Sequence, residues 1–288
     1  MKEGSITMSI RKIKKTVRGQ RTVDGAGVSL VRVLGYNDVY DFDPFLMLDA
    51  FDSLDPKDYT KGFPMHPHRG IETVTYLIRG KIEHEDSLKN KGVISDGECQ
   101  WMTAGSGILH EEMPKASERM LGLQLWLNLP KEDKMTMPQY FDVSKDMIPV
   151  VEEEDATIRV ISGDYKDKAQ GIDPKFVKAT FYDITLKPNK SITIDTNPEE
   201  NVFVFLIQGD AKLGDQHIPE KTAVLFGEGS TIEVSATDKE LQFVYLSGKP
   251  LNEPIAWAGP VVMNTKDELS QTFRELDEGT FIKHHIEK

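Results

Sequence analysis

Two short motifs contain the residues whose types and spacing could hold a metal ion. His66 and His68 flank Pro67, and a single residue separates His110 from Glu112. Successive side chains of a β-strand point to opposite faces, so residues at i and i+2 share one face. If each motif lies on a strand and the two strands face one cavity, three imidazoles and one carboxylate converge there.

The donor set narrows the kinds of ion that could bind. Three His and one Glu without a thiolate suit a first-row transition metal, and suit Zn less well because structural Zn sites favour Cys and His. An octahedral ion would keep two positions open for substrate and for water or O2. One buried His is more often a hydrogen-bonded core residue than a ligand, but three of the seven His fall in these motifs. The clustering therefore predicts a metal site.

Other polar residues near the motifs each allow two interpretations. Glu72 is an orienting partner of the site or a structural carboxylate. His84 is a hydrogen-bond donor near the pocket or a surface residue beside two acids. Gln124 lies in an apolar strand and lines either the pocket or the core. Pro67 lacks a backbone donor, so it suits a strand end better than a central ladder position.

Longer runs around the motifs resemble the pirin family, two-domain members of the cupin superfamily. The matching runs are FPMHPHRGIETVTYLIRG (63–80), HED (84–86), QWMTAGSGILHEEMP (100–114), GLQLW (122–126), DPFLMLDAF (43–51) and GPVVMNT (259–265). The resemblance spans most of the chain. It implies that the metal is held by His66, His68, His110 and Glu112, the set that the spacing also indicates.

The resemblance also implies an activity, because pirin-like proteins are associated with quercetin 2,3-dioxygenase activity. The substrate would be quercetin or a related planar aromatic enol, cleaved with O2. Glu112 would be the catalytic residue that takes the proton of the flavonol 3-hydroxyl. We expect one divalent transition metal per chain, Fe(II) first, because the site resembles iron sites with two His and one carboxylate; Mn, Co, Ni, Cu and Zn are alternatives.

A second hypothesis comes from another functional class. Animal pirin is a nuclear cofactor that contacts transcription factors, so the chain could be a non-enzymatic, redox-sensitive metal-binding protein with a regulatory protein partner. A third, weaker hypothesis is a cupin isomerase or sugar-binding protein. Only the basic run between Arg11 and Arg21 favours the regulatory hypothesis, and a solvated first strand is the simpler interpretation of that run.

Composition restricts the class of protein. The chain has 288 residues, 39% of them hydrophobic, which is enough for two cores. Cys99 is the only cysteine, so no intrachain disulfide forms. No run of 18 apolar residues and no signal-peptide h-region is present, which favours a cytoplasmic protein without membrane contact. The net charge of −12 repels phosphate, so we expect no direct nucleic-acid binding, and we expect a monomer.

Short apolar stretches separated by Gly, Pro, Asn and Asp predict an all-β protein. The sequence predicts two cupin-type β-barrel or sandwich domains, 1–142 and 143–288, packed face to face. One short helix is expected near the C-terminus. There Thr265 and Glu268 form a capping box, the apolar residues Leu269, Phe273 and Leu276 follow, and the run closes at a glycine.

An internal repeat supports the two-domain prediction. TVTYLIRGKI at 73–82 matches VFVFLIQGDA at 202–211, a constant offset of 129 residues. In this register the ligands correspond to Asp195, Asn197, Lys239 and Leu241, and a second register moves the last two to Val234 and Ala236. Neither register restores a His pair. We therefore expect the C-terminal domain to lack metal ligands.

Overall fold

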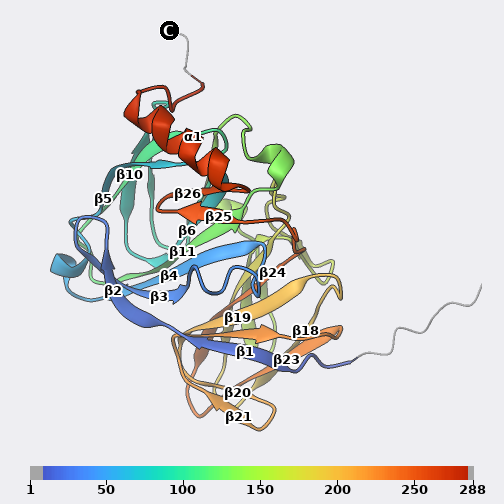
Figure 1. Cartoon of the computed structure of the whole chain (residues 1–288). Helices are drawn as coiled ribbons and strands as arrows, with labels where there is room; N and C mark the ends of the chain where they lie inside the picture. Colours follow the sequence, from blue (N-terminus) through green and yellow to red (C-terminus); the bar gives the residue numbers. More distant parts are fainter. Residues whose placement is uncertain (1–8, 285–288) are drawn as a thin grey trace, which may run out of the picture. The chain divides into compact units, whose positions relative to one another are not determined.

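The computed structural model describes residues 9–284, which form two compact units (Figure 1). The N-terminal unit comprises Gly19–Ile148, Pro174–Val177 and residues 251–284. The C-terminal unit comprises residues 9–18, Pro149–Asp173 and Lys178–Pro250. The N-terminal unit thus includes the last described segment of the chain and the C-terminal unit includes the first, whereas the predicted domains 1–142 and 143–288 are continuous. That boundary stays a prediction.

Two antiparallel sheets form the frame of the N-terminal unit. The seven-stranded sheet has the order β12 (Gln139–Val143), β9 (Cys99–Thr103), β6 (Ile71–Arg79), β11 (Met120–Asn128), β4 (Phe45–Ser53), β3 (Val28–Leu34) and β2 (Gln20–Asp24). The four-stranded sheet has the order β5 (Phe63–His68), β10 (Ile108–Pro114), β7 (Ile82–Asp86) and β8 (Lys91–Ile94). The unit also contains the hairpin β25 (Ala256–Ala258) and β26 (Val261–Met263), the helix α1 (Lys266–Asp277), and the 3-10 turns η1 (Pro56–Asp58), η2 (Lys131–Asp133) and η3 (Lys145–Met147).

The central strands of the seven-stranded sheet in the N-terminal unit are buried on both faces. All nine residues of β11 are buried, and β6 is buried up to its last residue. Strands covered on both sides read as continuous apolar runs, which explains GLQLWLNL and TVTYLI in the sequence. Apolar contacts such as those among Ile71, Met102 and Trp126 form the core, and burying one side chain of this size contributes about 1.5–3 kcal/mol.

The C-terminal unit repeats this two-sheet frame. Its seven-stranded sheet has the order β1 (Ile13–Arg18), β22 (Thr222–Phe226), β19 (Asn201–Gln208), β24 (Leu241–Gly248), β17 (Thr180–Leu186), β14 (Ala156–Ser162) and β13 (Val150–Glu152). Its four-stranded sheet has the order β18 (Ser191–Asp195), β23 (Thr231–Ala236), β20 (Ala211–Leu213) and β21 (Gln216–Ile218). A two-stranded ribbon joins β15 (Asp164–Tyr165) to β16 (Ala169–Gln170).

The predicted repeat has a structural counterpart. β6 and β19 are each the third strand of a seven-stranded sheet, and they carry the two matching segments. The interior of the C-terminal unit is filled by apolar side chains, including Ile192 and Ile194 on β18 and Val234 and Ala236 on β23. The residues that one predicted register aligns with His110 and Glu112 are therefore part of a hydrophobic core.

Most of the basic run lies at the start of the C-terminal unit, where β1 is an edge strand, and its last residue, Arg21, lies on β2 of the N-terminal unit. β1 alternates between half-buried and exposed residues, as expected for a strand with one solvated face. Arg11, just before β1, is the exception, because it is buried. Its Nε donates to Thr196 Oγ1 at 2.7 Å and its Nη2 donates to the carbonyl of Asn197. These contacts anchor the start of the strand.

The predicted C-terminal helix is confirmed, and its capping box forms as expected. Thr265 Oγ1 accepts from the Glu268 amide at 3.2 Å, and Glu268 Oε2 accepts from the Thr265 amide at 2.8 Å. The apolar stripe does not set the buried face, because Phe273 is 37% exposed. Thr272 is the buried residue of α1, and its hydroxyl accepts a hydrogen bond from the buried Arg69. The hydrogen bond between Arg69 and Thr272, and not the apolar stripe, therefore holds the helix in place.

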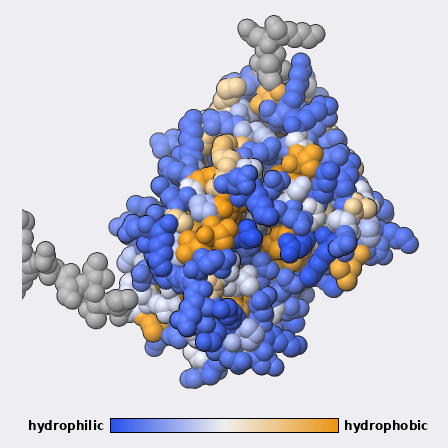
Figure 2. Space-filling view, turned by 180° about the vertical axis from the view of Figure 1, so that it is seen from behind, coloured by the Kyte–Doolittle hydropathy of each residue, from blue (hydrophilic) through white to orange (hydrophobic). Residues whose placement is uncertain are grey.

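The surface agrees with the acidic composition. The face drawn in Figure 2 is mostly hydrophilic, with separate hydrophobic areas between the polar residues. Within residues 9–284, no helix combines the length and the hydrophobicity needed to cross a bilayer.

Candidate metal centre

The two predicted ligand motifs lie on neighbouring strands of the four-stranded sheet. β5 pairs antiparallel with β10, and His66 stands opposite His110 in the register. β5 is the edge strand of this sheet, which accommodates the missing backbone donor of Pro67. The ladder shifts between His110 and Glu112, so Glu112 stands opposite Phe63.

Three imidazole rings converge at this point of the sheet. The nitrogen atoms that His66, His68 and His110 offer lie within 4.8 Å of one another. The Nε2 atoms of His66 and His68 are 3.0 Å apart. His68 and His110 are buried and His66 is half-buried, so the cluster lies at the edge of the core with one side accessible. Three nitrogens at this spacing form one face of a metal coordination sphere.

Backbone carbonyls orient two of the three rings. Nδ1 of His66 lies 2.8 Å from the Pro64 carbonyl, and Nδ1 of His68 lies 3.1 Å from the Pro260 carbonyl. An N–H at Nδ1 that donates to a carbonyl places the lone pair on Nε2, the usual arrangement for a metal-binding His.

His110 provides the test of whether a metal fits this site. Its ring is buried, and neither ring nitrogen has a hydrogen-bond partner in the described part of the chain. Buried polar atoms are almost always satisfied, so a ring aimed at two other imidazoles with no partner calls for a ligand. A metal ion held by the three His would satisfy it, and the residues present therefore fit the predicted ion.

Burial keeps the rings in the form that binds metals. Desolvation, acting together with the neighbouring His66, lowers the pKa of His68 to about 3. Desolvation also places the pKa of His110 well below its usual value, with His68 and His66 acting in the same direction. Neutral imidazoles keep a free lone pair, so both rings are ready to bind a cation at neutral pH.

Glu112 is buried on the same strand, but other side chains hold its carboxylate. Thr75 Oγ1 donates to Oε1 at 2.8 Å, and Gln124 Nε2 donates to Oε2 at 2.7 Å. Thr75 and Gln124 lie on the opposing sheet, directly across from each other on β6 and β11. The group of mutually close ligand atoms comprises the three His without Glu112. The role of Glu112 as the fourth ligand stays a prediction. Gln124 contacts the site through its hydrogen bond to Glu112.

Glu72 does not lie at the histidines. On β6 it is three residues from Thr75, so the two side chains point to opposite faces of the sheet. Its Oε1 accepts from Thr103 Oγ1 at 2.7 Å, and burial raises its pKa to about 7. Glu72 and His68 are separated by an even number of residues, so an unbroken strand would place both side chains on the same face. Gly70, with a φ of +79°, turns the chain between β5 and β6 and breaks this alternation. A Cβ at Gly70 would lie 1.9 Å from the Val262 carbonyl oxygen, so only glycine fits there.

His84 is buried and not a surface residue. It stands beside Glu112 in the β7–β10 pairing, and its ring contacts the hydroxyl of Tyr140. Asp142 Oδ1 lies 3.5 Å from its Nε2. Burial raises the pKa of the Tyr140 phenol, so the phenol stays protonated as a hydrogen-bond donor. His84 therefore forms a polar cluster with Tyr140 and Asp142, on β7 next to the ligand-bearing strand β10.

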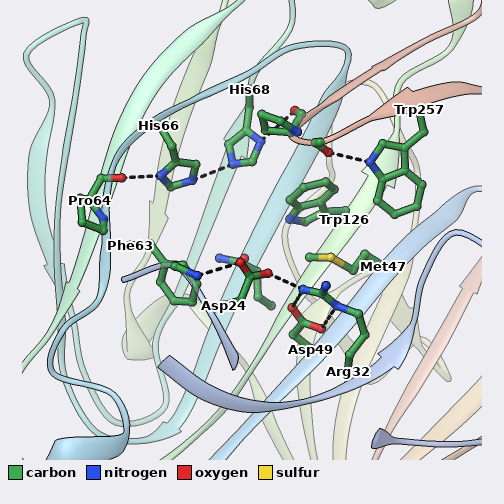
Figure 3. A pocket seen from close by; sticks show the side chains of 14 residues that line it. Asp24, Arg32, Met47, Asp49, Phe63, Pro64, His66, His68, Trp126 and Trp257 are labelled. Carbon is green, nitrogen blue, oxygen red and sulfur yellow. Dashed lines mark hydrogen bonds and ion pairs between the residues drawn. The ribbon is translucent and has the colours of Figure 1, made fainter. Parts of the chain in front are cut away.

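A cavity of about 490 Å³ opens beside His66 and His68 (Figure 3). Its wall includes the side chains of Met47, Phe63, Trp126 and Trp257. Such a wall suits a flat apolar ligand. The size is within the usual range for a small-molecule site.

A charged network borders the same cavity. Arg32 binds Asp49 through two hydrogen bonds, 2.9 Å and 2.7 Å long, and reaches Asp24 at 2.7 Å. These bonds raise the pKa of the Arg32 guanidinium, with Asp49 as the largest cause. The cation is thus already matched by two carboxylates and is not free to bind an anionic substrate.

Sequence reasoning missed most of the residues that complete the site. Asp24 and Arg32 come from the β2–β3 hairpin, and Trp257 and Pro260 come from the C-terminal segment. Their spacing from the His motifs in the sequence carries no signal, because long-range folding brings them together. Besides the histidines, Gln124 is a lining residue that the sequence predicts for the pocket or the core.

Comparisons with known proteins agree with this architecture. The Pirin family model matches residues 27–127, and the model of the Pirin C-terminal cupin domain matches residues 181–282. A pirin-like protein of Caulobacter vibrioides is 40% identical, covering 95% of this chain and 100% of its own. Human pirin is 38% identical, covering 93% of each chain.

A solved structure gives the same result for the fold. The crystal structure of a quercetin 2,3-dioxygenase from Acinetobacter baumannii superposes with a TM-score of 0.87 at 32% identity, covering 95% of this chain and 99% of that one. The predicted fold of two cupin domains with one C-terminal helix is confirmed. The chain therefore belongs to the pirin family.

Proposed function

We propose that the chain is a metal-dependent dioxygenase that cleaves quercetin, or a related planar aromatic enol, with O2. One observation carries the proposal: three His rings converge beside a cavity lined by flat apolar side chains, and one of them, His110, has no hydrogen-bond partner among the described residues. The similarity to the Acinetobacter baumannii quercetin 2,3-dioxygenase supports it.

His66, His68 and His110 would hold one divalent ion per chain, with Glu112 as the fourth ligand. Fe(II) is the metal we propose first, because the donor set resembles the iron sites with two His and one carboxylate. A bound ion would supply Lewis-acid polarisation of the enol hydroxyl and redox chemistry toward O2. The walls formed by Trp126 and Trp257 would orient the planar ring and exclude water.

Glu112 would take the proton of the enol hydroxyl, and its hydrogen bonds indicate where that proton resides. Gln124 Nε2 can only donate, so Oε2 must remain an acceptor. The Thr75 hydroxyl can donate or accept, so it can reverse its role when Oε1 carries a proton. The proton would therefore be held at Oε1, facing Thr75, while Gln124 keeps the carboxyl group in place.

The test measures metal content and turnover on the same samples. Protein purified without chelators and reconstituted with Fe(II), Mn(II), Co(II), Ni(II) or Cu(II) should consume quercetin with O2 uptake. Glu112→Gln should lose more turnover than metal, because an amide coordinates weakly but cannot accept the proton. Glu111→Gln is the matched control, since the neighbouring side chain points to the other face of β10. Quercetin loss no faster than with free metal in every form would leave a metal-binding regulatory protein as the better account.

A further inference from the structure

The charged network at the cavity wall lies across from the candidate metal centre. Both groups of side chains line the same cavity, with His66 and His68 along one side and Asp24, Arg32 and Asp49 along the other (Figure 3). The network comes from the β2–β3 hairpin and from β4, whereas the two histidines come from β5. A ligand that places an enol oxygen at the histidines and fills the cavity therefore brings another part of its surface to the network.

Within this network Asp24 is the carboxylate that a ligand can reach. The Asp24 side chain is 49% exposed, whereas that of Asp49 is 4% exposed and both of its oxygens accept from Arg32. Asp24 accepts one hydrogen bond at each oxygen, from the Gly25 amide at 2.7 Å and from Arg32 Nη2 at 2.7 Å. Because a carboxylate oxygen has two lone pairs, each oxygen of Asp24 can accept one more hydrogen bond.

Asp24 also keeps its negative charge at neutral pH. Burial raises the pKa of this carboxyl group, but the hydrogen bonds from Arg32 and the Gly25 amide outweigh burial and hold the pKa below its usual value. Arg32 carries one charge and pairs with both Asp49 and Asp24, so it cannot balance both carboxylates. The network therefore favours ligand groups that donate hydrogen bonds and disfavours anionic groups.

The turn after Asp24 fixes the position of this acceptor. Gly25 has a φ of +58°, and a Cβ there would lie 2.6 Å from the Phe63 ring. The Ala26 amide donates to the Gly62 carbonyl at 3.0 Å, which ties the turn to the chain at the start of β5. An acceptor that is already held in place costs a ligand less ordering than a mobile one.

We propose that Asp24 selects the substrate by accepting hydrogen bonds from hydroxyl groups of its aromatic rings, other than the enol that faces the histidines. The inference rests on the function proposed above and adds the chemical class of the substrate: a planar enol whose rings carry further hydroxyl groups. Such hydroxyls are the donors that a flat ligand beside Phe63, Trp126 and Trp257 can offer at its rim. A hydrogen bond to a charged acceptor strengthens binding by about tenfold or more.

The experiment measures binding without turnover. The protein is loaded with Zn(II), which has no redox chemistry, and the dissociation constants of two flavonols are measured by isothermal titration calorimetry. Quercetin carries hydroxyl groups on both outer rings, whereas 3-hydroxyflavone keeps only the enol hydroxyl on the same nucleus. Wild-type protein should prefer quercetin by about tenfold or more, and Asp24→Asn should lose most of this preference. Asn keeps the size of the side chain without its charge, so binding of 3-hydroxyflavone should stay unchanged and show that the cavity is intact.

Asp96→Asn is the matched control. Asp96 lies in the same unit outside the cavity wall, and its side chain is 53% exposed. Like Asp24, it accepts from a backbone amide, that of Gly80 at 2.7 Å, and pairs with an arginine, Arg79 at 3.7 Å. Asp96→Asn should leave both dissociation constants unchanged.

The possible failures are distinguishable. An equal preference for quercetin in the wild type and in Asp24→Asn would overturn the role of Asp24 and leave the proposed dioxygenase intact. Equal weakening of both flavonols in Asp24→Asn would overturn it as well, because the change would then not depend on the extra hydroxyls. If neither flavonol binds the loaded wild type, the proposed function is refuted, and this inference with it.

Discussion

Replacing Arg69, the residue next to His68, gives the sharpest test of how the ligand strand is held. The Arg69 side chain is buried, and its guanidinium donates to the Ser106 carbonyl at 2.7 Å and to the Phe281 carbonyl at 2.9 Å. It also forms an ion pair with Glu275 at 2.8 Å. In Arg69→Ala the two buried carbonyls lose this donor, and Glu275 loses one of the two cations that pair with it.

The magnitude follows from the burial of the Arg69 guanidinium. Each buried acceptor left without its donor costs about 1–3 kcal/mol, so loss of the Ser106 and Phe281 contacts together costs about 2–6 kcal/mol, while Lys283 still compensates Glu275. We therefore expect the free energy of unfolding of the N-terminal unit to fall by this amount in Arg69→Ala. All three Trp residues lie in the N-terminal unit, so Trp fluorescence during urea unfolding monitors that unit selectively.

A second cation at the same carboxylate provides the control. Lys283 also pairs with Glu275, at 2.9 Å, but its side chain is 32% exposed. Lys283→Ala should therefore cost less than about 1 kcal/mol. A loss below about 1 kcal/mol in Arg69→Ala, or equal losses in the two variants, would refute the view that the buried guanidinium holds α1 against the ligand strand.

Three further predictions concern the metal and one buried acid. His110→Ala should lose most bound metal, measured by elemental analysis, whereas His217→Ala in the C-terminal unit should not; retained metal in the first would refute the ligand assignment. The intact chain should bind one ion, and a second tight ion that survives removal of His66 and His68 would contradict this. Burial raises the pKa of Glu72 from 4.5 to about 7, so the folded state keeps a proton that the unfolded state releases. The free energy of unfolding should therefore decrease as the pH rises from about 4.5 to 7. Glu72→Gln should abolish this pH dependence, and an unchanged dependence would show that Glu72 is not responsible.

Local rules predicted the parts of the site that lie within single strands. The i, i+2 pairs were visible because strand alternation depends only on neighbouring residues, and the capping box at Thr265 was visible for the same reason. The sequence left two interpretations of Glu72 open, because it does not show that one glycine with positive φ resets the alternation between β5 and β6. A local pattern is informative only up to the next turn.

Long-range pairing explains what the sequence did not show. Pro260 reaches His68 through a backbone carbonyl, which has no residue-type signature. The contact of α1 through Thr272 was missed because it depends on a buried Arg in the distant turn between β5 and β6, and not on the apolar stripe. Partners of this kind become visible only after the chain is folded.

The interleaved composition of the two units has a consequence for protein synthesis. The strands that carry the histidines leave the ribosome early, but the carbonyl that orients His68 and the helix that holds Arg69 belong to residues 251–284. The C-terminal unit has the converse problem, since its edge strand β1 is made first and its partner β22 much later. A nascent chain therefore cannot finish either unit before nearly the whole protein is translated, and a fragment ending near residue 142 would carry the ligands without the groups that position them.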